Sequence, residues 1–190
     1  ERILWVGSNS EATGFHHPET QIVDCEGRTL IPGFIDSHCH LLAYASSKIS
    51  VDCGPSTSAS IQDIKDAILN QANKDSLGQW IRGVGYDHLT LKEKRHLNRW
   101  DLDSVVSDRP VRLNHRSGHA IVLNSLALNR VGISITTPDP MNGVIERDAN
   151  GEPTGLLLDM DEYLNGRIPS LPYEVFVTGV KAANQQMMSN

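Results

Sequence analysis

The sequence predicts an α/β fold, and two patterns indicate it. Ile31, Phe34 and Ile35 belong to an apolar run that is typical of a strand buried on both faces, as the parallel strands of α/β proteins are. Residues 61–72 then repeat isoleucine and alanine at helical spacing, behind a start at 60–63 that resembles a capping box. A strand of this kind with a helix after it favours the α/β class.

The remaining elements follow from alternation, spacing and turn residues. Asn150-Gly151 is a turn signal between two apolar segments, and it predicts a β-hairpin. Gly54-Pro55 interrupts a small, polar stretch, which we expect to form a loop. The other expected strands are 3–6, 21–25, 29–31, 34–38, 80–85 and 111–114, and the other expected helices are 90–99, 123–128 and 171–188.

Composition excludes some classes of partner. The net charge of −6 and the pI of about 5.7 argue against a nucleic acid or an anionic membrane as the partner. Cys25, Cys39 and Cys53 are odd in number and lack zinc-ribbon spacing, which predicts reduced thiols and a cytoplasmic location. No stretch approaches the roughly 18 apolar residues of a membrane span.

His38 and His40 are the candidate metal ligands. If the run that precedes them is a strand, Asp36, His38 and His40 point to the same face. Two imidazoles on one face can share a metal ion, and burying them with a carboxylate would be costly unless a metal satisfied them. A His-x-His pair also arises by chance as solvated or core histidines, because it specifies only two of the three or four ligands that a site needs.

The run LIPGFIDSHCHLL resembles the first barrel strand of the amidohydrolase superfamily, whose members carry a PGxID-x-H-x-H signature. The resemblance extends from about Ile3 to the C-terminus and points to the branch that includes N-substituted formamide deformylases. The other matching segments are ILWVG, VDCEGRT, WIRGVGYD, DRPVRLNHRSGHAIVLNSLAL and GVIERDANGEPTGLLLD.

This resemblance implies a partial TIM (β/α)8 barrel of the metal-dependent hydrolase type, preceded by part of a small β-sandwich. Residues 1–33 would belong to the sandwich and residues 34–190 to the N-terminal portion of the barrel, with a β-hairpin-containing insertion around 80–160. Such a barrel takes about 250 residues, and only about 150 follow Phe34. We therefore expect the chain to be a fragment that is truncated at both ends.

The resemblance also implies an activity, namely hydrolysis of a non-peptide carbon–nitrogen bond in a small amide or formamide substrate by metal-activated water. His38 and His40 would hold a divalent metal, and zinc is the expected metal, present as one or two ions. Asp36 would orient a ligand histidine without itself binding the metal. The general-base aspartate is expected beyond Asn190, so this chain alone should be inactive. Assembly as a homo-oligomer is compatible with this interpretation.

Two further residues are candidates for the substrate pocket or for support of the ligands. His119 belongs to a Gly-His that precedes Asn124-Ser125, as in the resembled family; the alternative is a loop histidine that bonds to backbone. Asp87 follows Gly85-Tyr86 at a place where the family has a similar aspartate, and it would line the barrel mouth. For His115 we expect a surface role.

Two other functions stay open. Within the superfamily, a deaminase with a single metal would release ammonia in place of formate or an amine. Outside catalysis, the chain could be a barrel fragment that serves as a binding or assembly module, which would require a stable, monodisperse 190-residue protein. Against that module, an open partial barrel leaves unpaired strand edges.

Overall fold

The computed structural model describes residues 2–74 and 79–189, and it divides the chain into two units, Glu1–Cys39 and His40–Asn190. Residues 1 and 190, which bound the predicted domains, lie outside the described residues. The boundary expected between residues 33 and 34 stays a prediction.

The second unit contains a six-stranded mixed sheet with the order β1-β2-β3-β4-β6-β5. The first three strands are parallel, and the other three join them in antiparallel pairs. The strands are β1 (Val51–Asp52), β2 (Ile81–Tyr86), β3 (Val111–His115), β4 (Ala120–Leu123), β5 (Val144–Arg147) and β6 (Pro153–Leu158). The α/β class is thus confirmed, whereas the partial barrel stays a prediction.

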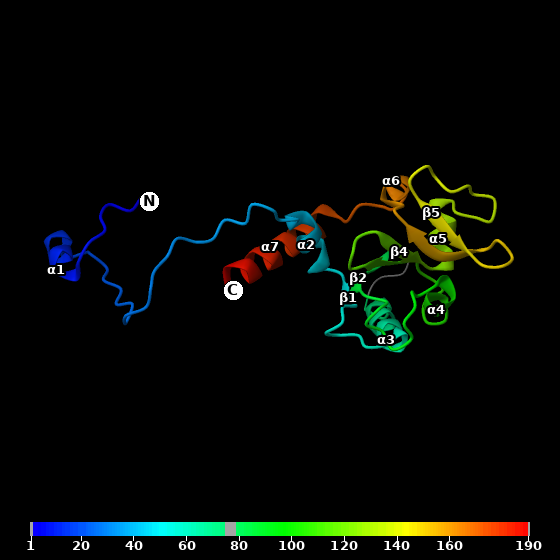
Figure 1. Cartoon of the computed structure of the whole chain (residues 1–190), viewed down its shortest axis with the longest axis horizontal. Helices are drawn as coiled ribbons and strands as arrows, with labels where there is room; N and C mark the ends of the chain where they lie inside the picture. Colours follow the sequence, from blue (N-terminus) through cyan, green and yellow to red (C-terminus); the bar gives the residue numbers. More distant parts are fainter. Residues whose placement is uncertain (1, 75–78, 190) are drawn as a thin grey trace. The chain divides into compact units, whose positions relative to one another are not determined.

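The described part of the second unit also contains helices. They are α2 (Leu41–Ser47), α3 (Ile61–Ala72), α4 (Arg99–Asp103), α5 (Ser125–Val131), α6 (Asp161–Leu164) and α7 (Tyr173–Ser189). Helix α3 begins at the expected capping box, in which the Ser60 hydroxyl accepts from the backbone N–H of Asp63. Helix α2 lies beside α7 (Figure 1), where Gly179 meets the carbonyl of Ala45 so closely that a side chain would not fit.

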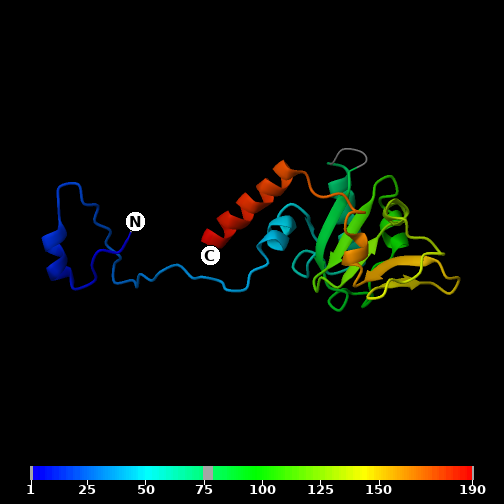
Figure 2. The same cartoon turned by 90° about the horizontal axis from the view of Figure 1, so that it is seen from above.

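The core consists of two apolar clusters, one on each face of the sheet. Along β4, Val122 packs into the cluster that contains α3 and α4, while Ile121 and Leu123 pack into the cluster that contains α5 and α6. All four residues of β4 are buried, so this strand is sandwiched between the clusters. Figure 2 shows α3 alongside the strands. Burial on both faces explains why the strand 120–123 carries no polar alternation that would reveal it in the sequence.

Several predicted elements match the structure. The hairpin around Asn150-Gly151 is present as β5 and β6. The strands expected at 80–85 and 111–114 and the helix expected at 171–188 appear within two residues of their predicted ends. The helix predicted over 90–99 is wrong, because residues 90–98 form turns and a loop, and α4 begins only at Arg99.

The first unit differs from its prediction. It contains α1 (Asn9–Ala12) and a 3-10 turn, η1 (Thr13–Phe15), and its described part, residues 2–39, has no strand. The expected strands at 3–6, 21–25, 29–31 and 34–38 are therefore absent there. The physical reason is pairing, since a strand needs a neighbour for its backbone groups. Phe34 is 94% exposed, so this segment also lacks the burial that its apolar run predicts.

Among residues 2–74 and 79–189, no helix has the length and apolar character needed to cross a membrane.

Candidate functional site

The parallel strands β2 and β3 end side by side and place polar residues at the same edge of the sheet. Asp87 follows β2 directly, and His115 is the last residue of β3, paired with Tyr86. The register shifts between Val84 and Tyr86, where Gly85 has a φ of +86°. This irregularity re-aims the end of β2, because an extra residue turns the following side chains.

The Asp87 carboxylate is buried and held on both oxygens. Arg116 Nη1 donates to Oδ2 at 3.0 Å, and the backbone N–H of Leu89 donates to Oδ1, also at 3.0 Å. The whole residue is 8% exposed. The hydrogen bond from Arg116 lowers the pKa of Asp87, with the Leu89 amide acting in the same direction. Asp87 is therefore ionised at neutral pH.

Three histidines gather next to this carboxylate. His88 Nδ1 lies 3.2 Å from His115 Nε2, which in turn lies 3.8 Å from Asp87 Oδ1. The ring of His96 stacks on that of His88, with centroids 3.8 Å apart. Desolvation, followed by the neighbouring imidazoles, lowers the pKa of His96 to about 4 and also lowers the pKa of His115. Both of these rings are therefore neutral at pH 7.

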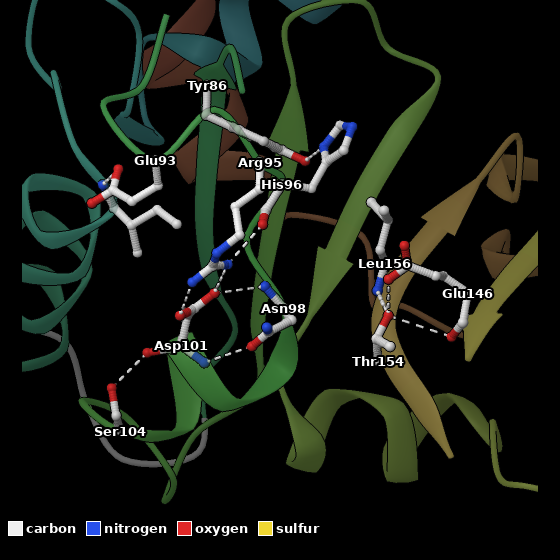
Figure 3. A network of polar contacts seen from close by, with 11 residues as sticks. Tyr86, Glu93, Arg95, His96, Asn98, Asp101, Ser104, Glu146, Thr154 and Leu156 are labelled. Carbon is white, nitrogen blue, oxygen red and sulfur yellow. Dashed lines mark hydrogen bonds and ion pairs between the residues drawn. The ribbon is translucent and has the colours of Figure 1, made fainter. Parts of the chain in front are cut away.

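Tyr86 contacts the histidine cluster, which we define as Asp87, His88, His96 and His115. Its buried hydroxyl is hydrogen-bonded to His96 Nδ1 at 2.8 Å (Figure 3), and its ring meets the ring of His115 edge-on with centroids 5.0 Å apart. Burial raises the pKa of Tyr86, so the hydroxyl stays protonated. The cluster borders a cavity of about 360 Å³. Its lining residues include His88, His96, Asn98, Glu146 and Thr154.

His115 is also connected to the loop that carries His119. The Ser117 Oγ lies 2.8 Å from His115 Nδ1, and the same oxygen accepts from the backbone N–H of His119 at 3.2 Å. The His119 ring points elsewhere, since its Nδ1 lies 2.7 Å from Asp159 Oδ1. This histidine is 77% exposed, and the backbone N–H of Asp159 donates to its carbonyl at 2.8 Å.

The residues singled out in the sequence thus lie in three places. Asp87 is in the histidine cluster, and His119 pairs with Asp159 on the adjoining loop. Asp36 and His38 belong to the first unit, where Asp36 Oδ1 accepts from the backbone N–H of His38 at 2.9 Å. His40 is the N-cap of α2 in the second unit. The roles predicted for Asp36, His38 and His40 stay predictions.

Sequence reasoning missed most of the cluster. The surface role expected for His115 is wrong, because its side chain is only 11% exposed. His88 and His96 carried no signal of their own, since neither belongs to a spaced motif. A usable signal was present. Asp87-His88 follows one strand of a parallel pair and His115 ends the other, and the carboxyl ends of parallel strands lie at the same edge of a sheet.

Comparison with known proteins gives the family of the chain. Residues 21–187 match the sequence profile of the Amidohydrolase family. Over 158 residues the chain is 39% identical to "N-substituted formamide deformylase" of Arthrobacter pascens, covering 83% of this chain and 29% of that protein. It is 37% identical over 160 residues to "Protein LONG AFTER FAR-RED 3" of Arabidopsis thaliana, covering 83% of this chain and 27% of that protein.

The fold is similar to that of a solved structure. An uncharacterized metal-dependent hydrolase from Pyrococcus horikoshii superposes with a TM-score of 0.55 at 24% sequence identity, covering 83% of this chain and 29% of that one. The chain thus spans less than a third of the length of these proteins. Because the family profile matches most of the sequence, the chain belongs to the amidohydrolase family.

Proposed function

We propose that this chain works as part of a metal-dependent hydrolase that cleaves non-peptide carbon–nitrogen bonds in small amide or formamide substrates. One observation carries the proposal: in a chain that matches the Amidohydrolase family over residues 21–187, Asp87 and the loop that carries His119 follow the carboxyl ends of two parallel strands. In α/β proteins this edge is where loops bring catalytic groups together. The likeness to a named formamide deformylase supports the choice of bond and substrate.

The metal of the reaction is zinc in this proposal, as one or two ions, with His38 and His40 as two of the ligands. When bound, such an ion polarises a carbonyl and lowers the pKa of its water toward about 7. Asp36 supports a ligand histidine. The general-base aspartate comes from a part of the enzyme that this chain does not contain, so the 190-residue chain is inactive alone.

His119 is the residue that we assign to the substrate. Its Nδ1 is bonded to Asp159, which fixes the ring orientation and leaves Nε2 for a polar group of the substrate. Asp159 has a φ of +51°, a conformation that favours glycine, and this places its carboxylate beside His119. Asp87 accepts a hydrogen bond from Arg116, which lies in the same loop as His119, and we assign this pair to the wall of the substrate pocket.

The test uses the enzyme that contains this chain together with its remaining barrel strands. We expect formate and an amine as products from an N-substituted formamide. We also expect that the double variant His38→Ala, His40→Ala loses both bound metal and turnover. His16 and His17, which both belong to the first unit, supply the control, and their replacement by alanine should change neither quantity.

Ammonia as the only product would favour a deaminase and contradict the proposal. Unchanged metal content and activity in the His38→Ala, His40→Ala variant would contradict the ligand assignment.

A further inference from the structure

We propose that Asp87, His88 and His115 bind a divalent cation of the zinc type, at a site built entirely from the second unit. The site does not use His38 or His40, and the inference does not rest on the hydrolase activity. One ligand atom of each of the three residues lies within 4.8 Å of the other two. The ligand set is two imidazole nitrogens and one carboxylate oxygen.

The spacing of the ligand atoms fits a tetrahedral ion. Zinc–ligand bonds of about 2.0–2.1 Å place neighbouring ligand atoms roughly 3.3 Å apart. The observed separations are 3.2 Å between the histidine nitrogens and 3.8 Å between His115 Nε2 and Asp87 Oδ1. The third pair, Asp87 with His88, lies within 4.8 Å, so these two side chains approach each other by up to about 1.5 Å when they receive the ion. Three protein ligands leave a fourth position open for water or another small ligand, as in catalytic zinc sites.

The partners behind the ligands also suit a metal. Metal-bound imidazoles commonly donate their other ring N–H to an oxygen, and Ser117 Oγ lies 2.8 Å from His115 Nδ1. The backbone N–H of Ser117 also donates to that nitrogen at 3.1 Å, so in the metal-free protein the His115 proton is on Nε2, facing His88. When a cation takes the place of this proton, the proton moves to Nδ1, where Ser117 Oγ accepts it, and the Ser117 backbone N–H has to give up its hydrogen bond to that nitrogen.

Arg116 does not block the site. It donates to Asp87 Oδ2, whereas Oδ1 is the oxygen that lies toward His115. The Arg116 side chain is also 62% exposed, so it can move away from the ion at little cost in desolvation. The cavity of about 360 Å³ is lined by His88 but by neither Asp87 nor His115, so it reaches one of the three ligands. Backbone constraints keep the three ligands together, since Asp87 and His88 follow the end of β2 and His115 is held in β3.

The experiment is a titration of the chelator-treated 190-residue chain with Zn²⁺ by calorimetry, and with Co²⁺ by visible absorption. We expect one site, with a Co²⁺ spectrum of four-coordinate nitrogen and oxygen ligation. We expect binding to weaken by at least about tenfold in His88→Gln and in His115→Gln. The site should persist in the His38→Ala, His40→Ala variant, which separates this inference from the proposed catalytic metal.

His119→Gln is the matched control, because His119 is also paired with a carboxylate but lies outside the cluster. It should bind the ion as the unmodified chain does. Circular dichroism checks the fold of each variant. If His115→Gln fails to fold, the His88→Gln result alone decides, since His88 is only half-buried. The proposal is overturned if the unmodified chain binds no ion, if His88→Gln binds as tightly, or if binding disappears with His38 and His40.

Discussion

At the scale of single residues, the surroundings of His96 make stability depend on pH. Its pKa is lowered from 6.5 to about 4, first by desolvation and then by His88 and His115. In the unfolded chain the ring takes up a proton near its ordinary pKa. Between pH 6.5 and pH 4 the unfolded state thus binds more protons, and stability falls as the pH falls through this window.

We expect the metal-free chain to lose on the order of 1 kcal/mol through His96 across that window, a value reduced because the ring is partly solvated. The measurement is the denaturation midpoint in urea at pH 7, 6, 5 and 4. His96→Gln should flatten the pH dependence, whereas His16→Gln, at an exposed position directly after η1, should leave it unchanged. Equal slopes for His96→Gln and the unmodified chain would contradict this explanation.

Asn124 is a buried polar residue that hydrogen-bonds to several backbone segments at once. Its Oδ1 accepts from the backbone N–H groups of Val111 and Ala127, and its Nδ2 donates to the carbonyls of Val106 and Arg109. It thus caps α5 and ties that helix to β3. The residue is 0% exposed, so these four backbone groups have no access to water as a substitute partner.

Asn124→Ala should therefore cost at least about 3 kcal/mol of unfolding free energy, because several buried donors and acceptors lose their partner together. Asn129→Ala, on the exposed face of the same helix, should change stability by less than about 0.5 kcal/mol. Urea denaturation of both variants measures the difference. Similar losses would show that the buried network carries no special weight.

At the scale of elements, the central strands come so close at Gly155 that no side chain fits. Gly155 in β6 has a φ of +95°, and a Cβ there would overlap the Leu123 carbonyl oxygen of β4. Gly132, which ends α5, has a φ of +75° with nothing near the position of a Cβ. The two glycines share a left-handed backbone conformation but differ in the free space around the position of a Cβ.

Gly132→Ala should cost about 1 kcal/mol from backbone strain alone. Gly155→Ala should cost at least about 2 kcal/mol more, because β4 and β6 must move apart. The comparison is made by thermal melts of both variants. Equal costs would mean that the strands accommodate the methyl group without separating.

At the scale of the whole molecule, stability resides in the second unit. Among the residues that the structure describes, every buried apolar side chain lies between Ala45 and Ala183. Removing residues 1–39 should therefore shift the melting temperature by less than about 2 °C. Ile64→Ala, which removes part of the core between α3 and the sheet, should lower the free energy of unfolding by about 2–5 kcal/mol and should clearly lower the melting temperature. A large loss of stability on removing residues 1–39 would contradict this division.

The amino-acid sequence by itself determined the family and the local elements with strong patterns. The PGFIDSHCH run and the segments that follow it carry the family resemblance, and the family match agrees. Helix α3 and the β5–β6 hairpin were predictable because a capping box, helical spacing and an Asn-Gly turn act over only a few residues. Local physics is sufficient for such elements.

Only the tertiary structure decided what the site contains. Asp87 and His88 are separated from His115 by 27 or more residues, and His96 comes from a loop without regular structure, so no local pattern could bring them together. Their meeting depends on the parallel pairing of β2 and β3 and on the bulge at Gly85. Conversely, the strand predicted at 34–38 is absent. Its apolar residues suit a buried strand, but a strand forms only where a neighbouring strand pairs with its backbone, and that neighbour comes from elsewhere in the fold.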